Sequence, residues 1–480
     1  MLNSRIATAV GIFLLAFCVR AVELARLSQI NLIFGHLNDG NLVSYDEGIN
    51  VAHSLVEYGE FANPFFNDPT GSTAHVAPSF PAQTALIFAV FGSGLAGGIA
   101  RDLVNIAGFS LLFALLPAIS GWLGMGSTPG MVAGITAAGY QLFGLAELSQ
   151  GRDEWLAALG LLLLTVYARR IAARDELAVR PALIYGAGWG ALMYVLPSMA
   201  LIFPAHLLVI LFARNRRPRK RLGFVALVGL TFLAAITPWT IRNRVVMGGL
   251  MFMRDNAGLE LEVSNGDGAK ANFEGQSSDS WFCSVHPNCN PAAAEQIRQV
   301  GEVEFNRLAM EKAVSWIQAN PARFAALTFR RAIYFWCDMR ADGDKFFIRA
   351  AISLLGLAGL WLMWTRGLTL QAALLGIVWI AYPTTFYMIQ YMERYVAPIG
   401  PAILLPAGFA AWALAAPTAK LVEAGGVEPP SEKARNEENY VRSLLLNFIR
   451  RLRNRQDSDR LVRLISGLGS GPKPAPYPTE

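Results

Sequence analysis

The chain has 480 residues, of which 54% are hydrophobic and only 16% are charged, with a formal net charge of +6. Soluble proteins carry about 25% charged residues, so the composition excludes a set of soluble domains, a disordered chain and a coiled coil. Four cysteines are too few for a small disulfide-stapled module. An integral membrane protein remains. Its basic residues lie in clusters beside apolar runs, and no nucleic-acid-binding motif occurs with them. We therefore expect no nucleic-acid partner.

Apolar runs close to the length that a bilayer requires, about 20 residues, recur along the chain. The first, residues 6–19, is followed by no small-residue cleavage site and predicts a retained span instead of a signal peptide. Further predicted spans cover about residues 103–123, 130–148, 155–168, 182–197, 198–213, 222–239, 346–364, 369–389 and 396–416. These runs predict an all-α polytopic membrane protein with about ten transmembrane helices.

Residues 81–99 are also apolar, and their assignment decides which loops share a side of the membrane. If they do not span and the N-terminus is cytoplasmic, Arg169, Arg170, Arg174, Arg180 and the basic cluster at 214–221 all fall inside, as the positive-inside rule requires. If they span, both clusters fall outside. We therefore expect a juxtamembrane or re-entrant helix at 81–99. The polar segments at 25–80, 149–154, 240–345 and 390–395 then share the outer face.

The sequence divides into four predicted parts. They are an N-terminal transmembrane module (1–239) with its first outer loop (25–99), an outer α-rich segment (240–345), C-terminal transmembrane helices (346–416), and a cytoplasmic part (417–480) with a charged linker, a basic amphipathic segment and a disordered tail. Cys283 and Cys289 lie in the outer segment, where an oxidising compartment favours a disulfide. A zinc site using His286 is the alternative, although no fourth ligand is evident.

Acidic pairs occur in two of the outer segments. Asp46 and Glu47 lie in the first loop, and an ionised carboxylate that raises the proton affinity of its neighbour suits acid–base catalysis near neutral pH. A helix N-terminus, where acids interact well with the dipole, is the structural alternative. Asp153 and Glu154 directly precede the span at 155–168, where they either hold a polar substrate or a cation, or merely mark the membrane boundary.

Basic and aromatic residues occur in or beside the other two outer segments, 240–345 and 390–395. Arg242 follows Trp239, and arginine grips phosphate bidentately, although anchoring to lipid headgroups is an alternative. Arg394 with Tyr395 suits phosphate or sugar, with a snorkelling cation in an aromatic belt as the alternative. Two acidic and two basic clusters on one face fit group transfer from a phosphate-linked donor embedded in the bilayer.

In their order and spacing these motifs resemble the GT-C class of polytopic glycosyltransferases that use lipid carriers. The class includes the protein O-mannosyltransferases and the lipid A aminoarabinose transferases. The resemblance covers about residues 1–416 and rests on Tyr45-Asp46-Glu47-Gly48, Ala77-Pro78-Ser79-Phe80-Pro81, Arg101 with Val104-Asn105, Glu154 with Asp153 as competitor, Pro238-Trp239-Thr240-Ile241-Arg242-Asn243, Asn256-Ala257-Gly258-Leu259-Glu260-Leu261 and Glu393-Arg394-Tyr395.

The resemblance implies transfer of a hexose or pentose from a polyprenyl-phosphate-linked donor to an acceptor hydroxyl, usually with inversion. The enzyme would lie in a bacterial cytoplasmic (inner) membrane with its active site on the periplasmic face. Its partners would be membrane lipid, the polyprenyl-phosphate sugar donor and an acceptor lipid, glycan or protein. Some relatives require a divalent metal and others do not, so no cofactor is assigned.

The resemblance also implies roles for individual residues. Asp46 would accept the proton of the attacking hydroxyl, and Glu47 or Glu154 would orient the acceptor or share that proton. The carrier phosphate would be bound by Arg101, Arg242 and Arg394. Aminoarabinose transferases have a lysine just before their double proline, near the donor phosphate. Here His75-Val76-Ala77-Pro78 has no lysine, and His75 is the candidate substitute.

A multi-span transporter or flippase for a lipid or solute is the alternative function. Transporters place ionisable residues at mid-membrane and often contain inverted repeats of broken helices. The predicted span interiors hold almost no charge and no repeat is visible in the sequence, which favours the transferase. A non-enzymatic membrane scaffold that binds partners through residues 240–345 remains as a third possibility, because a fold alone does not fix a function.

Overall fold

The computed structural model describes residues 2–28, 35–38, 41–44, 46–65, 69–139, 153–174, 177–213, 218–273, 280–337 and 344–415. Contacts group the chain into one unit of Met1–Trp412 and a second of Ala413–Glu480. The predicted linker, amphipathic segment and tail at 417–480 lie outside the described residues, and so does most of the outer segment at 149–154. The fold below is therefore that of the first unit.

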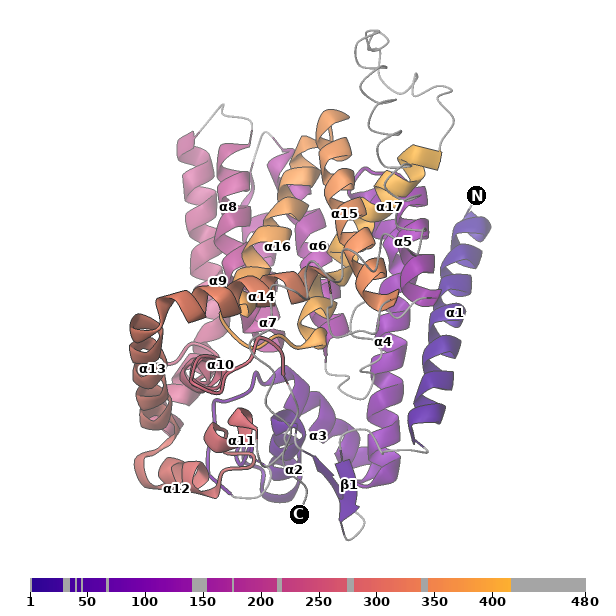
Figure 1. Cartoon of the computed structure of the whole chain (residues 1–480). Coiled ribbons are helices and arrows are strands. Elements are labelled where there is room, and N and C mark those ends of the chain that lie inside the picture. The colour runs from indigo at the N-terminus through magenta and orange to yellow at the C-terminus, as the bar shows by residue number, and fades with distance from the viewer. Residues whose placement is uncertain are drawn as a thin grey trace, which may run out of the picture. The chain divides into compact units, whose positions relative to one another are not determined.

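Seven helices in the described part are long and apolar enough to cross a membrane, and each coincides with a predicted span. They are α1 (Leu2–Ser28), α4 (Leu95–Trp122), α6 (Glu154–Ala172), α9 (Pro218–Met247), α15 (Asp344–Thr365), α16 (Thr369–Tyr387) and the run of η3 (Glu393–Ile399) into α17 (Gly400–Ala415) (Figure 1). Of the other three predicted spans, 182–197 falls on α7 (Val179–Val195) and 198–213 on η2 (Pro197–Leu201) with α8 (Ile202–Phe212). The first half of 130–148 falls on α5 (Ser127–Gly139), and residues 140–148 lie outside the described residues. The all-α polytopic fold is confirmed.

Small residues allow the bundle helices to pack closely. A Cβ atom at Gly186 of α7 would lie 2.5 Å from the carbonyl oxygen of Val228 in α9, and one at Gly190 would lie 2.4 Å from the Cβ of Ala235. Close backbone approach through small residues is the usual basis of helix association in membranes. Apolar side chains elsewhere on the bundle helices are exposed, Val245 of α9 at 77% and Ile380 of α16 at 72%, as lipid-facing positions require.

The apolar stretch at 81–99 forms two helices instead of one. α3 (Ser79–Phe91) has 13 residues, or about 20 Å at 1.5 Å per residue, which is short of the roughly 30 Å hydrocarbon core. It ends at Gly92, whose φ of 80° is left-handed, and α4 begins three residues later at Leu95. The corner is tight, because a Cβ at Gly97 would lie 1.9 Å from the Gly92 carbonyl oxygen.

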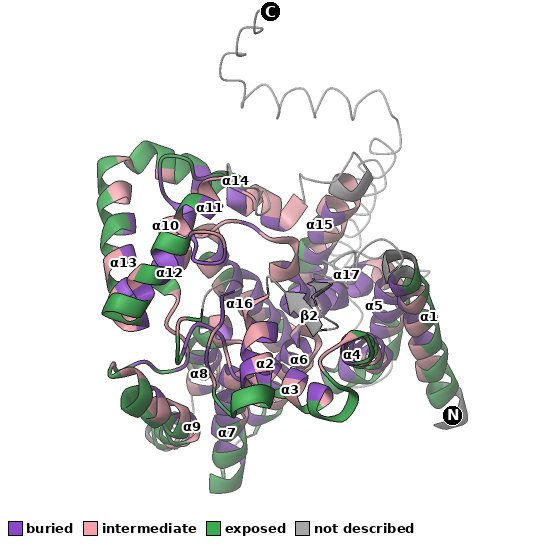
Figure 2. Cartoon of the chain, turned by 90° about the horizontal axis from the view of Figure 1, so that it is seen from below, coloured by how far each residue is buried: buried purple, intermediate pink, exposed green. Residues whose placement is uncertain are grey.

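The first loop and the 240–345 segment lie at the same end of the bundle (Figure 1). The loop contains a two-stranded antiparallel hairpin, β1 (Gly35–Asn38) and β2 (Asn41–Ser44), which the all-α prediction did not include, followed by α2 (Glu47–Tyr58). The second segment is helical as predicted, with α10 (Ala257–Ser264), α11 (Trp281–Val285), α12 (Pro291–Val300), α13 (Glu302–Ala319) and α14 (Pro321–Cys337). Figure 2 shows that the purple, buried faces of these helices turn toward one another.

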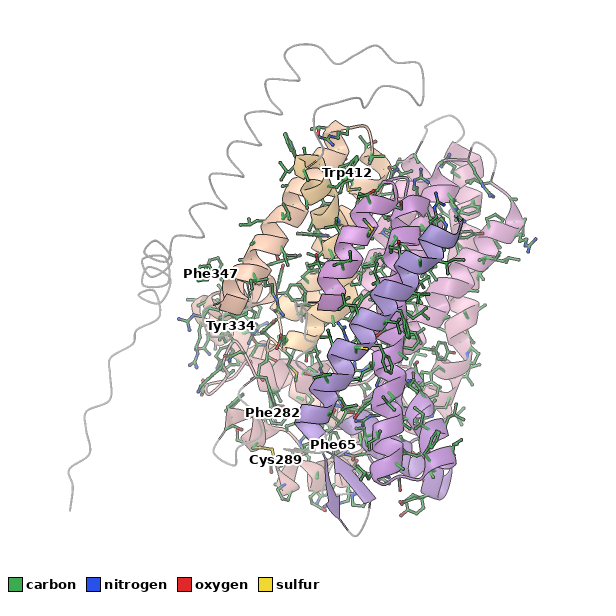
Figure 3. All side chains as sticks on the ribbon, turned by 90° about the vertical axis from the view of Figure 1, so that its right-hand side faces the viewer. Phe65, Phe282, Cys289, Tyr334, Phe347 and Trp412 are labelled. Atoms are coloured by element: carbon green, nitrogen blue, oxygen red, sulfur yellow. A yellow bond between two sulfur atoms is a disulfide. The ribbon has the colours of Figure 1, made fainter. Side chains whose placement is uncertain are left out.

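Apolar packing and backbone pairing join these segments. Phe65 of the first loop is buried with Leu259, Ile297 and Phe305 of the second segment, and Phe282 packs against them. Figure 3 shows Phe65 and Phe282 at this end of the molecule. Tyr391 joins the same assembly through its backbone, since its N–H donates to Ala271 O (2.8 Å) and its carbonyl accepts from Phe273 N (3.0 Å). Three segments that are distant in sequence therefore form one body at the bundle end.

Candidate functional site

A cavity of about 500 Å³ opens where these segments meet the bundle. Its lining comes from the beginnings of α2, α3 and α6, the junction of α7 with η2, the stretch 254–261, the end of α16 and η3. Prolines occur in several of these elements: Pro197 begins η2, Pro383 lies inside α16 near its end, and Pro398 lies near the end of η3. Proline removes a backbone hydrogen bond and interrupts regular helix.

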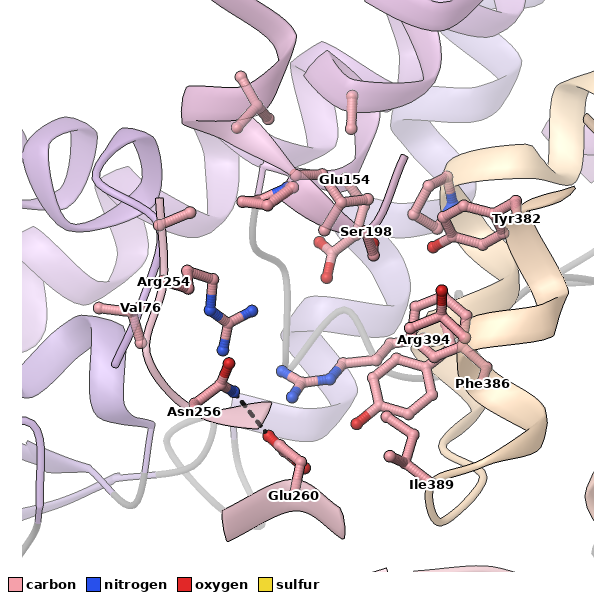
Figure 4. Close-up of a pocket in the computed structure, with 18 of the residues that line it drawn as sticks. Val76, Glu154, Ser198, Arg254, Asn256, Glu260, Tyr382, Phe386, Ile389 and Arg394 are labelled. Carbon is pink, nitrogen blue, oxygen red and sulfur yellow. Dashed lines mark hydrogen bonds between the residues drawn. The ribbon is translucent and has the colours of Figure 1, made fainter. Parts of the chain in front are cut away.

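Two acids lie at the start of α6, on the wall of this cavity. Asp153 directly precedes the helix and is only 6% exposed, and Glu154 is its first residue. Negative charge is favoured at a helix N-terminus because the helix dipole is positive there. In Figure 4 the carboxylate of Glu154 points into the cavity. The structure thus brings both predicted acids to the cavity.

Two arginines reach into the same space from different walls. The Arg254 Nε donates to the His75 carbonyl oxygen (2.8 Å), and the Arg394 guanidinium lies 5.6 Å from the centre of the Tyr395 ring. In Figure 4 both guanidinium groups point toward the middle of the cavity, below Glu154. Like charges that converge in a space with low dielectric repel each other, so an anion bound between them would be stabilised by both.

The remaining walls are polar on one side and apolar on the other. Asn256 Nδ2 donates to Glu260 Oε1 (3.1 Å), which holds a carboxylate and an amide together at the cavity edge. Such groups accept and donate hydrogen bonds to hydroxyls. Apolar side chains cover the rest, among them Val76, Phe80 and Leu201. This arrangement can hold an amphiphile that has a phosphate group, a hydroxylated head and an apolar tail.

Asp46 is not one of the residues that line the cavity, but it lies two positions before one of them, Gly48. It is the N-cap of α2, and its Oδ1 accepts from the backbone N–H groups of Gly48 (2.9 Å) and Ile49 (3.3 Å). Gly48 itself lines the cavity. A Cβ atom at position 48 would lie 2.5 Å from Phe80 Cδ1 and 3.2 Å from Asp46 Oδ1, so the glycine lets α3 pack directly against the start of α2.

Glu47 and His75 do not line the cavity. The Oε1 of Glu47 accepts from Asn288 Nδ2 (2.9 Å). A carboxylate oxygen of Glu47 and a ring nitrogen of His75 lie within 4.8 Å of each other and of a ring nitrogen of His286. Burial lowers the pKa of His286 to about 4, against a smaller opposite effect of Glu47. The loop that carries His286 and Asn288 is closed by the Cys283–Cys289 disulfide, with a Cα–Cα distance of 5.1 Å.

Two arginines assigned to the phosphate have other partners in the structure. Arg101 is 2% exposed inside α4, and its Nη2 pairs with Asp102 Oδ1 at 2.9 Å. Arg242 donates to the carbonyl oxygens of Thr73 (2.6 Å) and Phe61 (2.9 Å) and lies over the rings of Phe61 and Trp239. Neither lines the cavity, and Arg242 fastens the first loop to α9.

The motif at 393–395 separates its charges between two environments. Glu393 Oε1 pairs with Arg349 Nη2 at 3.4 Å, and Arg349 also donates to the Tyr391 hydroxyl. Arg394 and Tyr395 line the cavity, and the Tyr395 ring packs on Phe386 with centroids 4.4 Å apart. The ion pair thus links η3 to α15 at the residue directly before Arg394.

Sequence reasoning missed several residues of the cavity. Arg254 is not among the residues predicted from the sequence, and Asn256 and Glu260 belong to the segment 256–261, for which the sequence predicts no role. The sequence feature that could have identified these three residues is their position just after the Arg242 motif, in the same outer segment. Ser198 and Tyr382 also line the cavity. Polar side chains inside predicted spans and beside Pro197 and Pro383 were the available signal.

Comparison with known proteins finds similar structures but no similar sequences. No family model and no curated protein matches the sequence. Among solved structures, the apo oligosaccharyltransferase of Archaeoglobus fulgidus is similar over 93% of this chain and 54% of its own, with a TM-score of 0.50 and 13% identity. The same organism's oligosaccharyltransferase AglB, solved with an inhibitory peptide and a dolichol-phosphate, gives a TM-score of 0.48, 13% identity and coverage of 92% and 54%.

The first of these likenesses shows that the chain shares its fold with that oligosaccharyltransferase. The chain spans about half the length of the solved enzymes that it resembles. At this identity the likeness concerns the fold alone, and the activity is argued from the cavity.

Proposed function

We propose that the protein is a glycosyltransferase of the bacterial cytoplasmic membrane that moves a hexose or pentose from a polyprenyl-phosphate-linked donor to an acceptor hydroxyl at the periplasmic face. The observation that carries the proposal is the convergence of Arg254, Arg394 and Glu154 in one cavity whose other walls are largely apolar. A sugar joined to a lipid by phosphate has an anion, hydroxyls and an apolar chain, and this cavity has a counterpart for each.

In the proposed reaction an acceptor oxygen attacks the anomeric carbon of the donor. The bond from that carbon to the phosphate oxygen breaks, and its electron pair stays on the phosphate. Arg254 and Arg394 stabilise the leaving phosphate, because fixed cations are most effective where negative charge develops. Asp46 takes the acceptor proton, and Glu154 orients the acceptor hydroxyl. The acceptor is a lipid, a glycan or a protein.

The substitution Asp46→Asn tests the catalytic assignment. Asparagine caps helices about as well as aspartate, so α2 should keep its start while the proton acceptor is lost. Loss of general-base catalysis should lower transfer by roughly 10²- to 10⁴-fold. Transfer is measured in membranes with radiolabelled polyprenyl-phosphate sugars. Glu57→Gln, an exposed acid on the same helix, is the matched control.

Equal transfer by wild type and Asp46→Asn would overturn the assignment of Asp46. Label that crosses the membrane while still joined to its carrier, with no transfer to any acceptor, would instead favour the transporter.

A further inference from the structure

A second cluster of polar side chains lies beside the cavity and lines no part of it. Glu47, His75 and His286 each offer a donor atom, and the three atoms lie within 4.8 Å of one another. Both histidines are buried, at 2% and 5% exposure. The three residues come from the start of α2, from the turn before α3 and from the disulfide-closed loop 283–289. No single motif would have connected them.

The surroundings fix the rings in place. Phe65 meets both imidazoles edge-on, with centroid distances of 5.1 Å to His75 and 5.7 Å to His286. Phe282 stacks on His286 at 4.4 Å. Asn288 Nδ2 holds Glu47 Oε1, as described above, so the carboxylate already has an orienting partner. Oriented first ligands with supporting hydrogen bonds are typical of metal sites in proteins.

The donor set selects a class of metal. Two imidazoles and one carboxylate suit first-row transition ions, above all Zn²⁺, whereas Mg²⁺ and Ca²⁺ prefer oxygen ligands alone. Zinc–ligand bonds are about 2.0–2.2 Å long, so donors within 4.8 Å of one another need only a small inward movement. The cysteines of the same loop do not take part, because they form a disulfide.

Metal binding costs a hydrogen bond at His286. The Asn288 backbone N–H donates to His286 Nδ1 (3.1 Å), which leaves the ring proton on Nε2 in the metal-free protein. Coordination through Nδ1 displaces this N–H, and coordination through Nε2 moves the ring proton to Nδ1, so either mode gives up one neutral hydrogen bond. That loss is small against coordination of a transition metal by three protein ligands.

We propose that Glu47, His75 and His286 bind a Zn²⁺-class ion, which ties the first loop to the 240–345 segment and stabilises both. The ion is structural, since none of its ligands lines the cavity. The proposal of this metal site does not depend on the proposed transfer reaction. Glu47 adjoins Asp46, so the bound ion also holds the start of α2.

The test is the metal content of the full-length protein, purified in detergent without a histidine tag. The background carries Cys18→Ser and Cys337→Ser, so that the two free cysteines bind no zinc. After removal of metal with chelator, incubation with Zn²⁺ and desalting, elemental analysis should find about one zinc per chain. Zinc affinity should fall by more than about 100-fold in His75→Asn and His286→Asn, because even changes to outer partners cost roughly 10- to 100-fold.

His53→Gln is the matched control. His53 is a half-buried histidine on α2 that packs against Phe88 outside the cluster, and its variant should keep the zinc. A second readout needs no variant: chelator should lower the unfolding temperature of the wild-type protein, and Zn²⁺ should restore it. Wild-type protein that takes up no zinc, or His286→Asn that retains it fully, overturns the proposal. Cobalt spectra with a thiolate charge-transfer band would do the same.

Discussion

Thr73 in the first loop and Glu302 at the start of α13 are hydrogen-bonded across 229 positions of sequence, with Thr73 Oγ1 donating to Glu302 Oε2 over 2.5 Å. The Ala74 backbone N–H donates to the other carboxylate oxygen at 2.8 Å. Glu302 is 5% exposed, and burial raises its pKa to about 7 against the lowering effect of these hydrogen bonds. Burial also raises the pKa of the nearby Asp255 to about 6.

The raised pKa of Glu302 predicts that the free energy of unfolding falls as the pH rises. A carboxyl whose folded-state pKa exceeds its ordinary value binds its proton more tightly in the folded state, so its contribution is complete below about pH 4.5 and is lost as the pH rises through about 7. A shift from 4.5 to about 7 corresponds to on the order of 3 kcal/mol. Thermal unfolding in detergent, followed between about pH 5 and pH 8, should show this decline.

Glu302→Gln should flatten that pH dependence. The amide keeps an oxygen for Ala74 N–H and a nitrogen that can donate to the Thr73 hydroxyl, so the contact survives without a titrating group. Glu304→Gln, an exposed acid two residues along α13 that pairs with Arg307, is the control and should leave the slope unchanged. An identical slope in Glu302→Gln and wild type would contradict the assignment.

The two cavity arginines predict a graded effect on transfer. Arg254→Ala and Arg394→Ala should each lower kcat by roughly 10²- to 10³-fold, because each removes a fixed donor from the leaving phosphate. Arg→Lys at either position keeps the charge and loses the planar fork, so we expect an intermediate loss. Arg244→Ala, an exposed arginine of α9 away from the cavity, should transfer sugar at the wild-type rate. Equal rates in all variants would contradict phosphate binding by this pair.

The periodic features of the fold were predictable from the sequence. The apolar runs gave α4, α6, α9, α15 and α16 nearly at their observed positions, because membrane helices must satisfy their backbone internally and face lipid. The hairpin at 35–44 was not predicted, since two strands of four residues carry too short an alternation to be distinguished from a loop.

The partners of individual side chains were not predictable. The sequence predicts Arg242 as a phosphate ligand, but its acceptors include the backbone carbonyls of Thr73 and Phe61, and Thr73 lies 169 positions away. Every residue has a backbone carbonyl, so the sequence does not show which of them accepts from a given arginine. Arg254 was not predictable for the same reason, since its Nε donates to the His75 carbonyl, 179 positions away. Of the predicted acids, Asp153 and Glu154 line the cavity, and Asp46 and Glu47 do not. Tertiary contacts decide which arginines reach it.

Arg242 is therefore predicted to act on stability more than on donor binding. Arg242→Ala leaves the carbonyls of Thr73 and Phe61 without this donor, and should lower the free energy of unfolding by on the order of 2 kcal/mol. Lysine at this position cannot bridge both carbonyls and should rescue little. The measurement pairs unfolding temperature with the KM for the donor, with Arg244→Ala as control. A raised KM at unchanged unfolding temperature would return Arg242 to the phosphate site.

The disulfide should matter through the loop that it closes. Cys283 and Cys289 are six positions apart, and a loop of this length gains roughly 2 kcal/mol from the reduced entropy of the unfolded chain. The double variant Cys283→Ser/Cys289→Ser should lose about that much stability. It should also bind zinc more weakly, because the loop orients His286 and Asn288 toward Glu47.

Removal of the other two cysteines, in Cys18→Ser/Cys337→Ser, is the matched control for this prediction, since both are free thiols. Unfolding temperature with and without Zn²⁺ separates the two effects. If the loop positions the ligands, the loss caused by the Cys283/Cys289 change is larger with Zn²⁺ than with chelator, because binding adds to stability only as far as the folded site exists. An equal loss under both conditions would mean that the disulfide stabilises the loop without organising the metal ligands.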